Sequence, residues 1–411
     1  MGNIKEIKEK LAKYEQAHVL RFYDSLSGKE KETLLNQIEK IDFDLMKKLY
    51  ENREEYKEEK SRFSPIPYVD KSKLEQKEID RYTMIGENII KSNKFAFVTL
   101  AGGQGTRLGH NGPKGTFMLG IKPDKSLFEI MCDSLKRAYE KYEVYIPWYI
   151  MTSRDNNEDT IKFFEQNNYF DYPIEKIRFF IQGELPMISD KGYLLLEKKG
   201  KIKEGADGHG GIFEAMSKNN IIVDMEDKGI EWVFIGGIDN VLLKIVDPLF
   251  IGMAKDNDVK LAGKSIVKAN PEEKVGVFCK RNGRPSVMEY SEITEKMANA
   301  CDENGELLYG ESHILCNLFS IEALRTIGTE KLPYHTAYKN TSYVDDFGSE
   351  HTPLGPNAYK FETFIFDAFS MFDNMLILRT LREEEFAPIK NKEGVDSPKT
   401  ARELYTAFWG M

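Results

Sequence analysis

The sequence predicts an α/β protein with a doubly wound, mixed but mainly parallel sheet, an N-terminal helical region and a small C-terminal unit. Three observations predict this fold. The first 92 residues space their apolar side chains as helices do, short apolar runs then alternate with amphipathic stretches, and 411 residues suit two or three structural units. We therefore expect an N-terminal helical region at 1–92, a central domain at 93–340 and a C-terminal segment at 341–411.

The N-terminal region is predicted to be helical because its apolar residues recur at near-helical spacing between charged ones. These residues are Ile4, Ile7, Leu11, Tyr14, Val19 and Phe22. Ser27 stands directly before "GKEKETLLNQIEKI", so we expect it to cap a helix there. The charged run "ENREEYKEEKSRF" at 51–63 is expected to be a solvated helix face or loop, and Pro65 and Pro67 end the helical pattern.

The central region is predicted to alternate strands and helices. The expected strands are "KFAFVTLA", "VYIPWYIM", "IRFFIQ" and "EWVFIGGI", and the expected helices are "SLFEIMCDSLKRAYEKY", "DNNEDTIKFFEQNN" and "DPLFIGMAKDN". This alternation is typical of parallel βαβ units with helices on both faces of a sheet. Between about 259 and 320 strand signals crowd together, which predicts antiparallel additions, and after 340 a loop-rich stretch with "MLILRTL" indicates a small separate unit.

The composition excludes several classes of protein. Hydrophobic residues make up 41% and charged residues 30%, which is ordinary for a soluble globular chain. No apolar run reaches the length of a membrane span and the N-terminus lacks a secretory signal, so we expect a cytoplasmic protein with no membrane partner. The net charge of -9 argues against a nucleic-acid partner. The four cysteines form no CxxC pair, so we expect reduced, mostly buried thiols.

A glycine-rich loop (102–116) follows the first predicted strand, in "VTLAGGQGTRLGHNGPKGTF". It matches neither GxxxxGK[ST] nor GxGxxG. Closely spaced glycines let consecutive backbone N–H groups line an anion, and Arg107 and Lys114 can reach the same space, so the loop is predicted to hold phosphate. The residues alone leave open a tight strand-to-helix turn with two surface cations.

Successive stretches of the chain resemble, in the same order, the motifs of the eukaryotic-type UDP-sugar pyrophosphorylases, especially the UDP-N-acetylhexosamine pyrophosphorylases. The stretches are "YEQAHVLRFYDSL", "LAGGQGTRLG…PKG", "FIQGELPMI", "DGHGGIFEAM", "IDNVLLKIVDPLFIG", "EKVGV…VMEYSEI", "LPYHTAYKN" and "REEEFAPIKN". The resemblance spans roughly residues 10–400. It implies a Rossmann-like nucleotide-diphospho-sugar transferase fold, a nucleotidyltransferase domain at 93–340, and a segment at 341–411 that completes the active site.

The resemblance also implies the reaction. The family transfers a uridylyl group from UTP to a sugar 1-phosphate and releases pyrophosphate. We expect UTP and N-acetylglucosamine 1-phosphate as substrates, with glucose 1-phosphate or several sugars as the alternative. A nucleotide-sugar-binding regulator without turnover is a third hypothesis, which the presence of Arg107, Lys114, Asp239 and Lys390 disfavours. We further expect a monomer or weak homo-oligomer.

The chemistry demands charge neutralisation rather than a general base. A sugar phosphate is largely a dianion at neutral pH, so the difficulty lies in gathering negative charges around the α-phosphorus. The resemblance implies that Arg107 and Lys114 hold the triphosphate and the departing pyrophosphate, and that Asp239 binds Mg²⁺ (or Mn²⁺). Lys339 and Lys390 are implied to contact phosphates from later segments of the chain.

The remaining implied roles concern the nucleotide and the sugar. Backbone atoms of Leu100, Ala101, Gly102 and Gly103 would contact uracil and ribose, Gln182 would recognise uracil, and Gly208 would lie against the nucleotide. Asn240 would meet a ribose or sugar hydroxyl, unless Asp239 and Asn240 simply form a turn. We expect Asp239 at the same sheet edge as the glycine-rich loop.

Two motifs disagree about the sugar. Glu289, Tyr290 and Ser291 in "MEYSE" match the sugar-binding motif of the acetylhexosamine enzymes, and Asn317 matches a second sugar-contacting position. However, Ile314 and Leu318 replace residues that are usually Asn and His. His209 replaces the asparagine of the "DGNGG" stretch that the acetylhexosamine enzymes resemble here. A histidine in this stretch is usual in the UDP-glucose branch. We therefore expect both sugar 1-phosphates to be used, with a modest preference.

Overall fold

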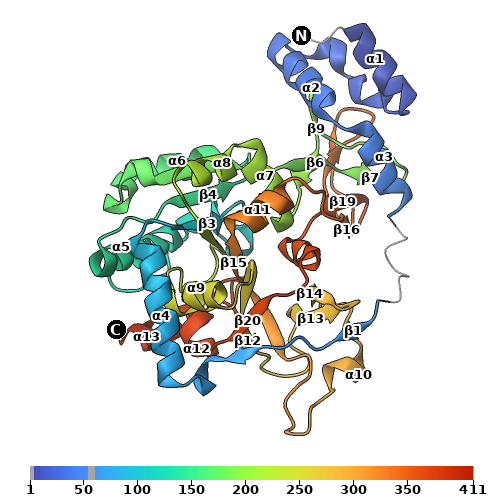
Figure 1. The fold of residues 1–411 in the computed structure, drawn as a ribbon. Helices are drawn as coiled ribbons and strands as arrows, with labels where there is room; N and C mark the ends of the chain where they lie inside the picture. The colour runs from blue at the N-terminus through green and yellow to red at the C-terminus, as the bar shows by residue number, and fades with distance from the viewer. Residues whose placement is uncertain (1–3, 54–60, 411) are drawn as a thin grey trace. The chain divides into compact units, whose positions relative to one another are not determined.

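The computed structural model describes residues 4–53 and 61–410, in two compact units (Figure 1). Unit 1 comprises Met1–Lys60, Gly183–Gly211 and Leu332–Phe364. Unit 2 comprises Ser61–Gln182, Ile212–Lys331 and Ile365–Met411. The boundaries expected at 92/93 and 340/341 stay a prediction. Most of the charged run at 51–63, namely 54–60, lies outside the described residues.

Unit 1 begins with three helices, α1 (Ile4–Lys13), α2 (Gly28–Lys40) and α3 (Phe43–Glu51). The predicted cap of α2 is confirmed: Ser27 Oγ accepts from the Glu30 N–H at 3.4 Å, and the Glu30 carboxylate accepts from the Ser27 N–H at 2.9 Å. Leu11 and Val19, from the predicted apolar series, are fully buried in the core of this unit. The helical spacing therefore marked the face that packs.

The strands of unit 1 are short. A three-stranded sheet has the order β16-β19-β7, and the pairs β10-β6, β17-β18 and β8-β9 are separate. Their bounds are β6 (Glu184–Pro186), β7 (Ile188–Ser189), β8 (Leu196–Lys198), β9 (Lys201–Ile202), β10 (Glu204–Ala206), β16 (His335–Lys339), β17 (Tyr343–Val344), β18 (Glu350–His351) and β19 (Ala358–Glu362). Phe361 of β19 and Ile188 of β7 join the helices in one core.

Unit 2 is built on a large mixed sheet, in which Figure 1 labels β3, β4, β12, β15 and β20. The strand order is β2-β20-β12-β15-β11-β3-β4-β5. The strands are β2 (Val69–Asp70), β3 (Phe95–Leu100), β4 (Trp148–Thr152), β5 (Ile177–Ile181), β11 (Trp232–Gly237), β12 (Leu261–Val267), β15 (Glu311–Ser320) and β20 (Leu376–Arg379). Neighbours pair in parallel except around β15, which is antiparallel to both β11 and β12. The expected mainly parallel sheet is confirmed.

The antiparallel additions predicted between 259 and 320 are also confirmed. β13 (Val277–Arg281) pairs with β14 (Arg284–Met288) and with β15, and β1 (Phe63–Ser64) pairs with β13. The stretch "MLILRTL" contributes β20, which pairs with β12 and β2 in the main sheet rather than in a sheet of its own. A short apolar strand gains ladder bonds and burial at such a position. Of the C-terminal segment, 341–364 lies in unit 1 and 365–411 in unit 2.

Helices cover both faces of the unit 2 sheet. On one face the core includes side chains of α4 (Gln76–Lys91), α5 (Leu127–Tyr142), α6 (Asn157–Gln166), α9 (Pro248–Asp256) and α13 (Pro398–Trp409). On the other face lie α7 (Ile212–Lys218), α8 (Ile221–Asp227) and α11 (Ile321–Gly328). There the Tyr149 hydroxyl of β4 donates to Asp224 of α8 at 2.6 Å, and the rings of Phe213 and Phe319 meet edge to face. The remaining short helices are α10 (Glu295–Ala298) and α12 (Arg382–Glu385).

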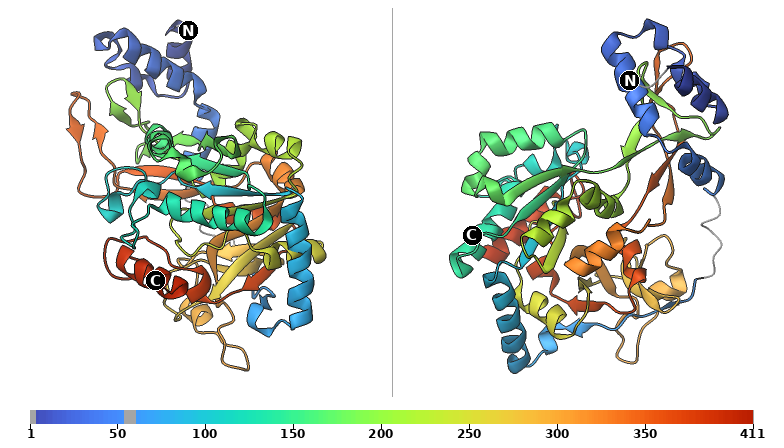
Figure 2. Two further views of the ribbon diagram at one scale, coloured as in Figure 1. Left: turned by 90° about the vertical axis from the view of Figure 1, so that its left-hand side faces the viewer. Right: turned by 45° about the horizontal axis from the view of Figure 1, so that its top comes forward.

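Helices α4 and α9 lie side by side with their backbones in contact (Figures 1 and 2). A Cβ at Gly252 of α9 would overlap the carbonyl oxygen of Tyr82, and one at Gly86 of α4 would overlap that of Pro248. Glycine is therefore required at both positions for this close approach. In the part of the chain that the structure describes, no helix is both long and apolar enough to cross a membrane.

Candidate functional site

The predicted nucleotide site is built from loops at one edge of the unit 2 sheet. Strands β3, β4, β5 and β11 are parallel, so their carboxyl ends share an edge, where ligands bind in open α/β sheets. The glycine-rich loop follows β3, Gln182 follows β5 and Asp239 follows β11. The Ile238 N–H donates to the Leu100 carbonyl at 3.2 Å. The expected common edge for the loop and Asp239 is therefore confirmed.

The glycine-rich loop is folded back on itself. Its backbone bonds include Lys114 N–H to Gly103 O at 3.0 Å and Gly105 N–H to Gly112 O at 2.9 Å. A Cβ at Gly102 would lie 2.6 Å from Oε1 of Gln182, whereas one at Gly103 would have open space around it. The predicted uracil-recognising side chain thus lies against the loop, and there is free space on the side of Gly103 where a Cβ would lie.

Asn156 holds the start of this loop through hydrogen bonds, although it is not among the predicted site residues. Its Nδ2 donates to the carbonyls of Ala101 at 2.9 Å and Gly103 at 3.2 Å, while its Oδ1 accepts from the Ser153 N–H at 2.8 Å. The side chain is fully buried. In the sequence, Asn156 stands near the start of the predicted helix "DNNEDTIKFFEQNN", where asparagine is an ordinary cap residue, so only the fold reveals this contact.

The two cationic candidates in the loop differ in their surroundings. Lys114 is half-buried, and its Nζ lies 3.5 Å from Oδ2 of Asp239. Arg107 is exposed, in a short 3-10 turn. The structure therefore places one lysine and one carboxylate in contact at the sheet edge, with a second cation in the same loop.

The segment that carries Lys390 is tied to the loop that carries Asp239. The Ile389 N–H donates to the Asp239 carbonyl at 2.9 Å, and Nζ of Lys390 lies 3.5 Å from Asp396. Asn240 is buried, and its side chain makes protein contacts: Nδ2 donates to the Glu385 carbonyl at 2.7 Å, and Oδ1 accepts from the Ala387 N–H at 2.9 Å. These bonds connect Asn240 to the backbone of the segment that carries Lys390. Contact of Asn240 with a ribose or sugar hydroxyl stays a prediction.

The predicted sugar-binding residues of unit 2 lie on β14 and β15 or directly after them. Glu289 is half-buried, whereas Tyr290 and Ser291 are exposed. Asn317 is fully buried: its Oδ1 lies 3.2 Å from Nε2 of His313, and its Nδ2 has no hydrogen-bond partner among the described residues. Contact of Asn317 with a sugar stays a prediction.

Three predicted residues lie in unit 1. A Cβ at Gly208, whose φ is 87°, would overlap the Thr363 carbonyl, so this position requires glycine. The imidazole of His209 stacks on Phe364 with ring centroids 5.2 Å apart. Lys339 is exposed on β16. The structure thus gives the His209 ring a defined orientation.

Asp239 is the one residue that the sequence predicts to bind a metal. Within 4–53 and 61–410, no three His, Cys, Asp or Glu side chains are grouped as a metal site. A single carboxylate fits Mg²⁺, which commonly uses one or two protein carboxylates together with substrate phosphate oxygens and water. The residues present therefore fit a metal that arrives with the nucleotide.

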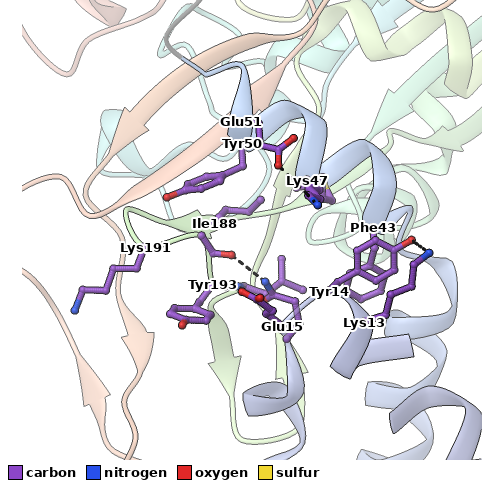
Figure 3. A pocket seen from close by; sticks show the side chains of 14 residues that line it. Lys13, Tyr14, Glu15, Phe43, Lys47, Tyr50, Glu51, Ile188, Lys191 and Tyr193 are labelled. Carbon is purple, nitrogen blue, oxygen red and sulfur yellow. Dashed lines mark hydrogen bonds and ion pairs between the residues drawn. The ribbon is translucent and has the colours of Figure 1, made fainter. Parts of the chain in front are cut away.

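Unit 1 also holds a cavity of about 390 Å³, shown in Figure 3. The residues that line it include the aromatic side chains Tyr14, Phe43, Tyr50 and Tyr193, which are labelled in the figure. None of the predicted site residues lines it. The presence of this cavity therefore does not identify the predicted site.

Comparison with known proteins identifies relatives over nearly the whole chain. The sequence profile of UTP–glucose-1-phosphate uridylyltransferase matches residues 43–395. The chain is 37% identical over 409 residues to UDP-N-acetylhexosamine pyrophosphorylase-like protein 1 of Xenopus tropicalis, covering 94% of this chain and 80% of the relative. It is 34% identical over 414 residues to UDP-N-acetylglucosamine pyrophosphorylase of Saccharomyces cerevisiae, covering 95% and 87%.

Comparison with solved structures finds the same kind of relatives. The uridine diphosphate N-acetylglucosamine pyrophosphorylase of Trypanosoma brucei, solved with an inhibitor, matches with a TM-score of 0.85 and 28% identity over 99% of this chain and 85% of that one. A mutant UDP-glucose pyrophosphorylase of Leishmania major shares the fold at 15% identity, with a TM-score of 0.66 over 89% and 77%. Because profile, relatives and folds coincide, the chain belongs to the UDP-sugar pyrophosphorylase family.

Proposed function

We propose that the protein is a uridylyltransferase that converts UTP and N-acetylglucosamine 1-phosphate to UDP-N-acetylglucosamine and pyrophosphate. The observation that carries the proposal is the contact between Lys114 and Asp239 at the carboxyl edge of the sheet, where Lys114 is also bonded through its N–H to Gly103 of the glycine-rich loop. The names of the relatives support this substrate over glucose 1-phosphate. Relatives named for N-acetylglucosamine or N-acetylhexosamine reach 37% identity, whereas the matched UDP-glucose pyrophosphorylase from Leishmania major is 15% identical.

The protein's part in the reaction is alignment and charge neutralisation. The sugar phosphate attacks the α-phosphorus of UTP, a new P–O bond forms, and the bond to the β-phosphate oxygen breaks as pyrophosphate leaves. Lys114 holds the triphosphate and the departing pyrophosphate, with Arg107 and Lys390 contributing further positive charge. Preorganised cations of this kind lower the barrier because they need not reorganise during the reaction.

Nucleotide recognition uses the backbone as much as side chains. Leu100, Ala101, Gly102 and Gly103 present main-chain groups to uracil and ribose. The Gln182 amide, packed against Gly102, reads the polar edge of the base. In this proposal Asn156 acts as a positioning residue, because it fixes the carbonyls of Ala101 and Gly103.

Asp239 would hold the metal. Mg²⁺ or Mn²⁺, when bound, supplies positive charge to the α-phosphate oxygens. Because Asp239 already contacts Lys114, nucleotide binding would bring one carboxylate, one ammonium group and the phosphates together.

The finer fold description, a doubly wound Rossmann-like sheet of the nucleotide-diphospho-sugar transferase type, also belongs to this proposal, as do a cytoplasmic location and a monomeric or weakly oligomeric state. Helices on both faces of the sheet support the doubly wound description.

A single assay tests the proposal. Pyrophosphate release is measured with UTP, Mg²⁺ and a panel of N-acetylglucosamine, N-acetylgalactosamine and glucose 1-phosphates. We expect the highest kcat/KM with N-acetylglucosamine 1-phosphate. Highest kcat/KM with glucose 1-phosphate would favour the alternative substrate, and binding of UTP without turnover would favour a regulator.

A further inference from the structure

A charged cluster lies fully inside unit 2, outside the predicted site. Lys264, in the middle of β12, has no exposed surface. Its Nζ lies 2.7 Å from Oδ2 of Asp247 and 2.8 Å and 3.0 Å from the two carboxylate oxygens of Glu385. Asp247 is 2% exposed and Glu385 is not exposed at all. We call these three residues the buried cluster.

Stability alone does not account for the buried cluster. Removing charges from water costs several kcal/mol each, and apolar residues of similar volume are often as stabilising or more so. Burial disfavours the charged form of Lys264, yet the two carboxylates raise its pKa above the usual value. Burial likewise opposes ionisation of Asp247, but Lys264 and Lys244 lower its pKa, whereas burial raises the pKa of Glu385. An ammonium group that stays charged in the core imposes directional bonds, which apolar packing does not.

The buried cluster connects three segments of the chain. Lys264 belongs to β12, Asp247 immediately precedes α9, and Glu385 ends α12. From Glu385 the connection continues directly to the predicted site: its carbonyl accepts from Asn240 at 2.7 Å. Further along, the Ile389 N–H donates to the Asp239 carbonyl at 2.9 Å, one residue before Lys390.

We propose that the buried cluster is a positioning device that fixes the segment 385–390, and with it Lys390, relative to Asp239. Lys264 anchors the Glu385 side chain to the centre of the sheet, and the backbone bonds then set the register between the 239–241 loop and the 385–390 segment. The inference rests on the proposed function, in which Asp239 and Lys390 act on the same phosphates.

The expected effect is large because alignment errors are costly. A displacement of about 1 Å at a reacting group can lower turnover about 10²-fold. Loss of the Glu385 anchor should therefore lower kcat by about 10- to 100-fold, while KM for UTP changes by less than about three-fold. A purely structural role would instead lower the fraction of folded enzyme and leave turnover per folded molecule unchanged.

Glu385→Leu tests the inference, because it removes the anchor and leaves Lys264 paired with Asp247. Glu385→Gln is the conservative variant, since its amide oxygen can still accept from Lys264. The matched control is Glu311, a buried carboxylate on β15 that accepts from Arg379 at 2.9 Å and from Ser265 at 2.5 Å. Glu311→Leu and Glu311→Gln break a buried ion pair of the same sheet without touching Asn240 or Glu385.

Two readouts are measured on folded, full-length protein. The first is kcat with UTP and the best sugar 1-phosphate, for which we expect wild type above Glu385→Gln above Glu385→Leu, with both Glu311 variants near wild type. The second is backbone hydrogen exchange over 385–390, which should accelerate in Glu385→Leu but not in Glu311→Leu. The exchange readout needs no activity, so it separates failure of the inference from failure of the proposed function.

Equal loss of kcat in the Glu385 and Glu311 variants would overturn the inference, as would unchanged exchange over 385–390 in Glu385→Leu. If either Leu variant does not fold, the two Gln variants decide. Glu385→Gln should then be at least about three-fold slower than Glu311→Gln, and equal turnover would contradict the proposal.

Discussion

Lys114 is the residue through which the proposed chemistry is most directly tested. Its Nζ lies 3.5 Å from Asp239, and 17% of its side chain is exposed, so truncation removes a charge without opening the core. Lys114→Ala should lower kcat by about 10²- to 10³-fold, the usual loss for one preorganised contact. Lys94→Ala is the control, because Lys94 also pairs with a carboxylate, Glu231 at 2.6 Å, but at the opposite end of β3. Normal turnover in folded Lys114→Ala would show that Lys114 is only a surface lysine.

His209 is expected to influence the choice of sugar. Its ring is oriented by stacking on Phe364, and imidazole can donate to or accept from a sugar hydroxyl. We expect a preference of about 10- to 200-fold between the two sugar 1-phosphates, the range for small differences in a pocket. His209→Asn should shift the kcat/KM ratio toward N-acetylglucosamine 1-phosphate. An unchanged ratio would assign specificity to the neighbourhood of Glu289 and Asn317.

His18 should make the stability of unit 1 depend on pH. Burial lowers its pKa, the bond of Nε2 to the Leu194 carbonyl at 2.8 Å opposes this, and Arg21 lowers the pKa further. The folded protein therefore resists a proton that the unfolded chain accepts below about pH 6.5, so the stability is present above that pH and lost as pH falls through the folded pKa.

The measurement is hydrogen exchange or thermal unfolding of unit 1 between about pH 7.5 and 5.5, compared with His18→Gln. Gln keeps a donor for the Leu194 carbonyl but does not titrate. Wild type should lose more stability than the variant over this range. Parallel pH curves for the two proteins would rule out His18 as the source.

At the scale of elements, the contact of α4 with α9 gives the sharpest prediction. Gly252→Ala forces a methyl group against the Tyr82 carbonyl, and overpacking of this kind costs about 1–3 kcal/mol. Gly28→Ala is the control, because a Cβ at the start of α2 would meet nothing within 4 Å. Denaturant unfolding should show a lower free energy of unfolding for Gly252→Ala and little change for Gly28→Ala. Equal stability of both variants would mean that α4 and α9 separate at no cost.

The sequence predicts an element well where its residues are buried on both faces. Every residue of β3, β4 and β11 is buried, so each strand reads as a nearly continuous apolar run, broken only by Thr99 in β3 and Thr152 in β4. The two-residue strands of unit 1, such as β7 and β9, have no such run, and their pairing depends on distant partners. The burial of Lys264 could not be predicted, because within "LAGKSIVK" it resembles a solvated lysine, and its partner Glu385 lies 121 residues away.

At the scale of the whole molecule, the chain passes repeatedly between two units. Residues 183–211 and 332–364 leave unit 2 and pack with the N-terminal helices, around shared core residues such as Phe361 and Leu196. The spacing of apolar residues along the chain cannot predict this division, because the segments 183–211 and 332–364 are stabilised by contacts with residues far away in the sequence. The common edge of the glycine-rich loop and Asp239 could be predicted locally, because the carboxyl ends of parallel strands meet at one edge of a sheet. The roles of the individual site residues stay predictions.

The proposed activity of the whole molecule is uridylate transfer with N-acetylglucosamine 1-phosphate as the preferred acceptor. The most direct measurement follows UTP labelled in uridine and in its β- and γ-phosphates, with Mg²⁺ and N-acetylglucosamine 1-phosphate present. We expect uridine label to appear in UDP-N-acetylglucosamine as labelled pyrophosphate is released in equal amount, and Lys114→Ala to slow the formation of both products together. Bound UTP with neither product formed, or release of phosphate in place of pyrophosphate, would contradict it.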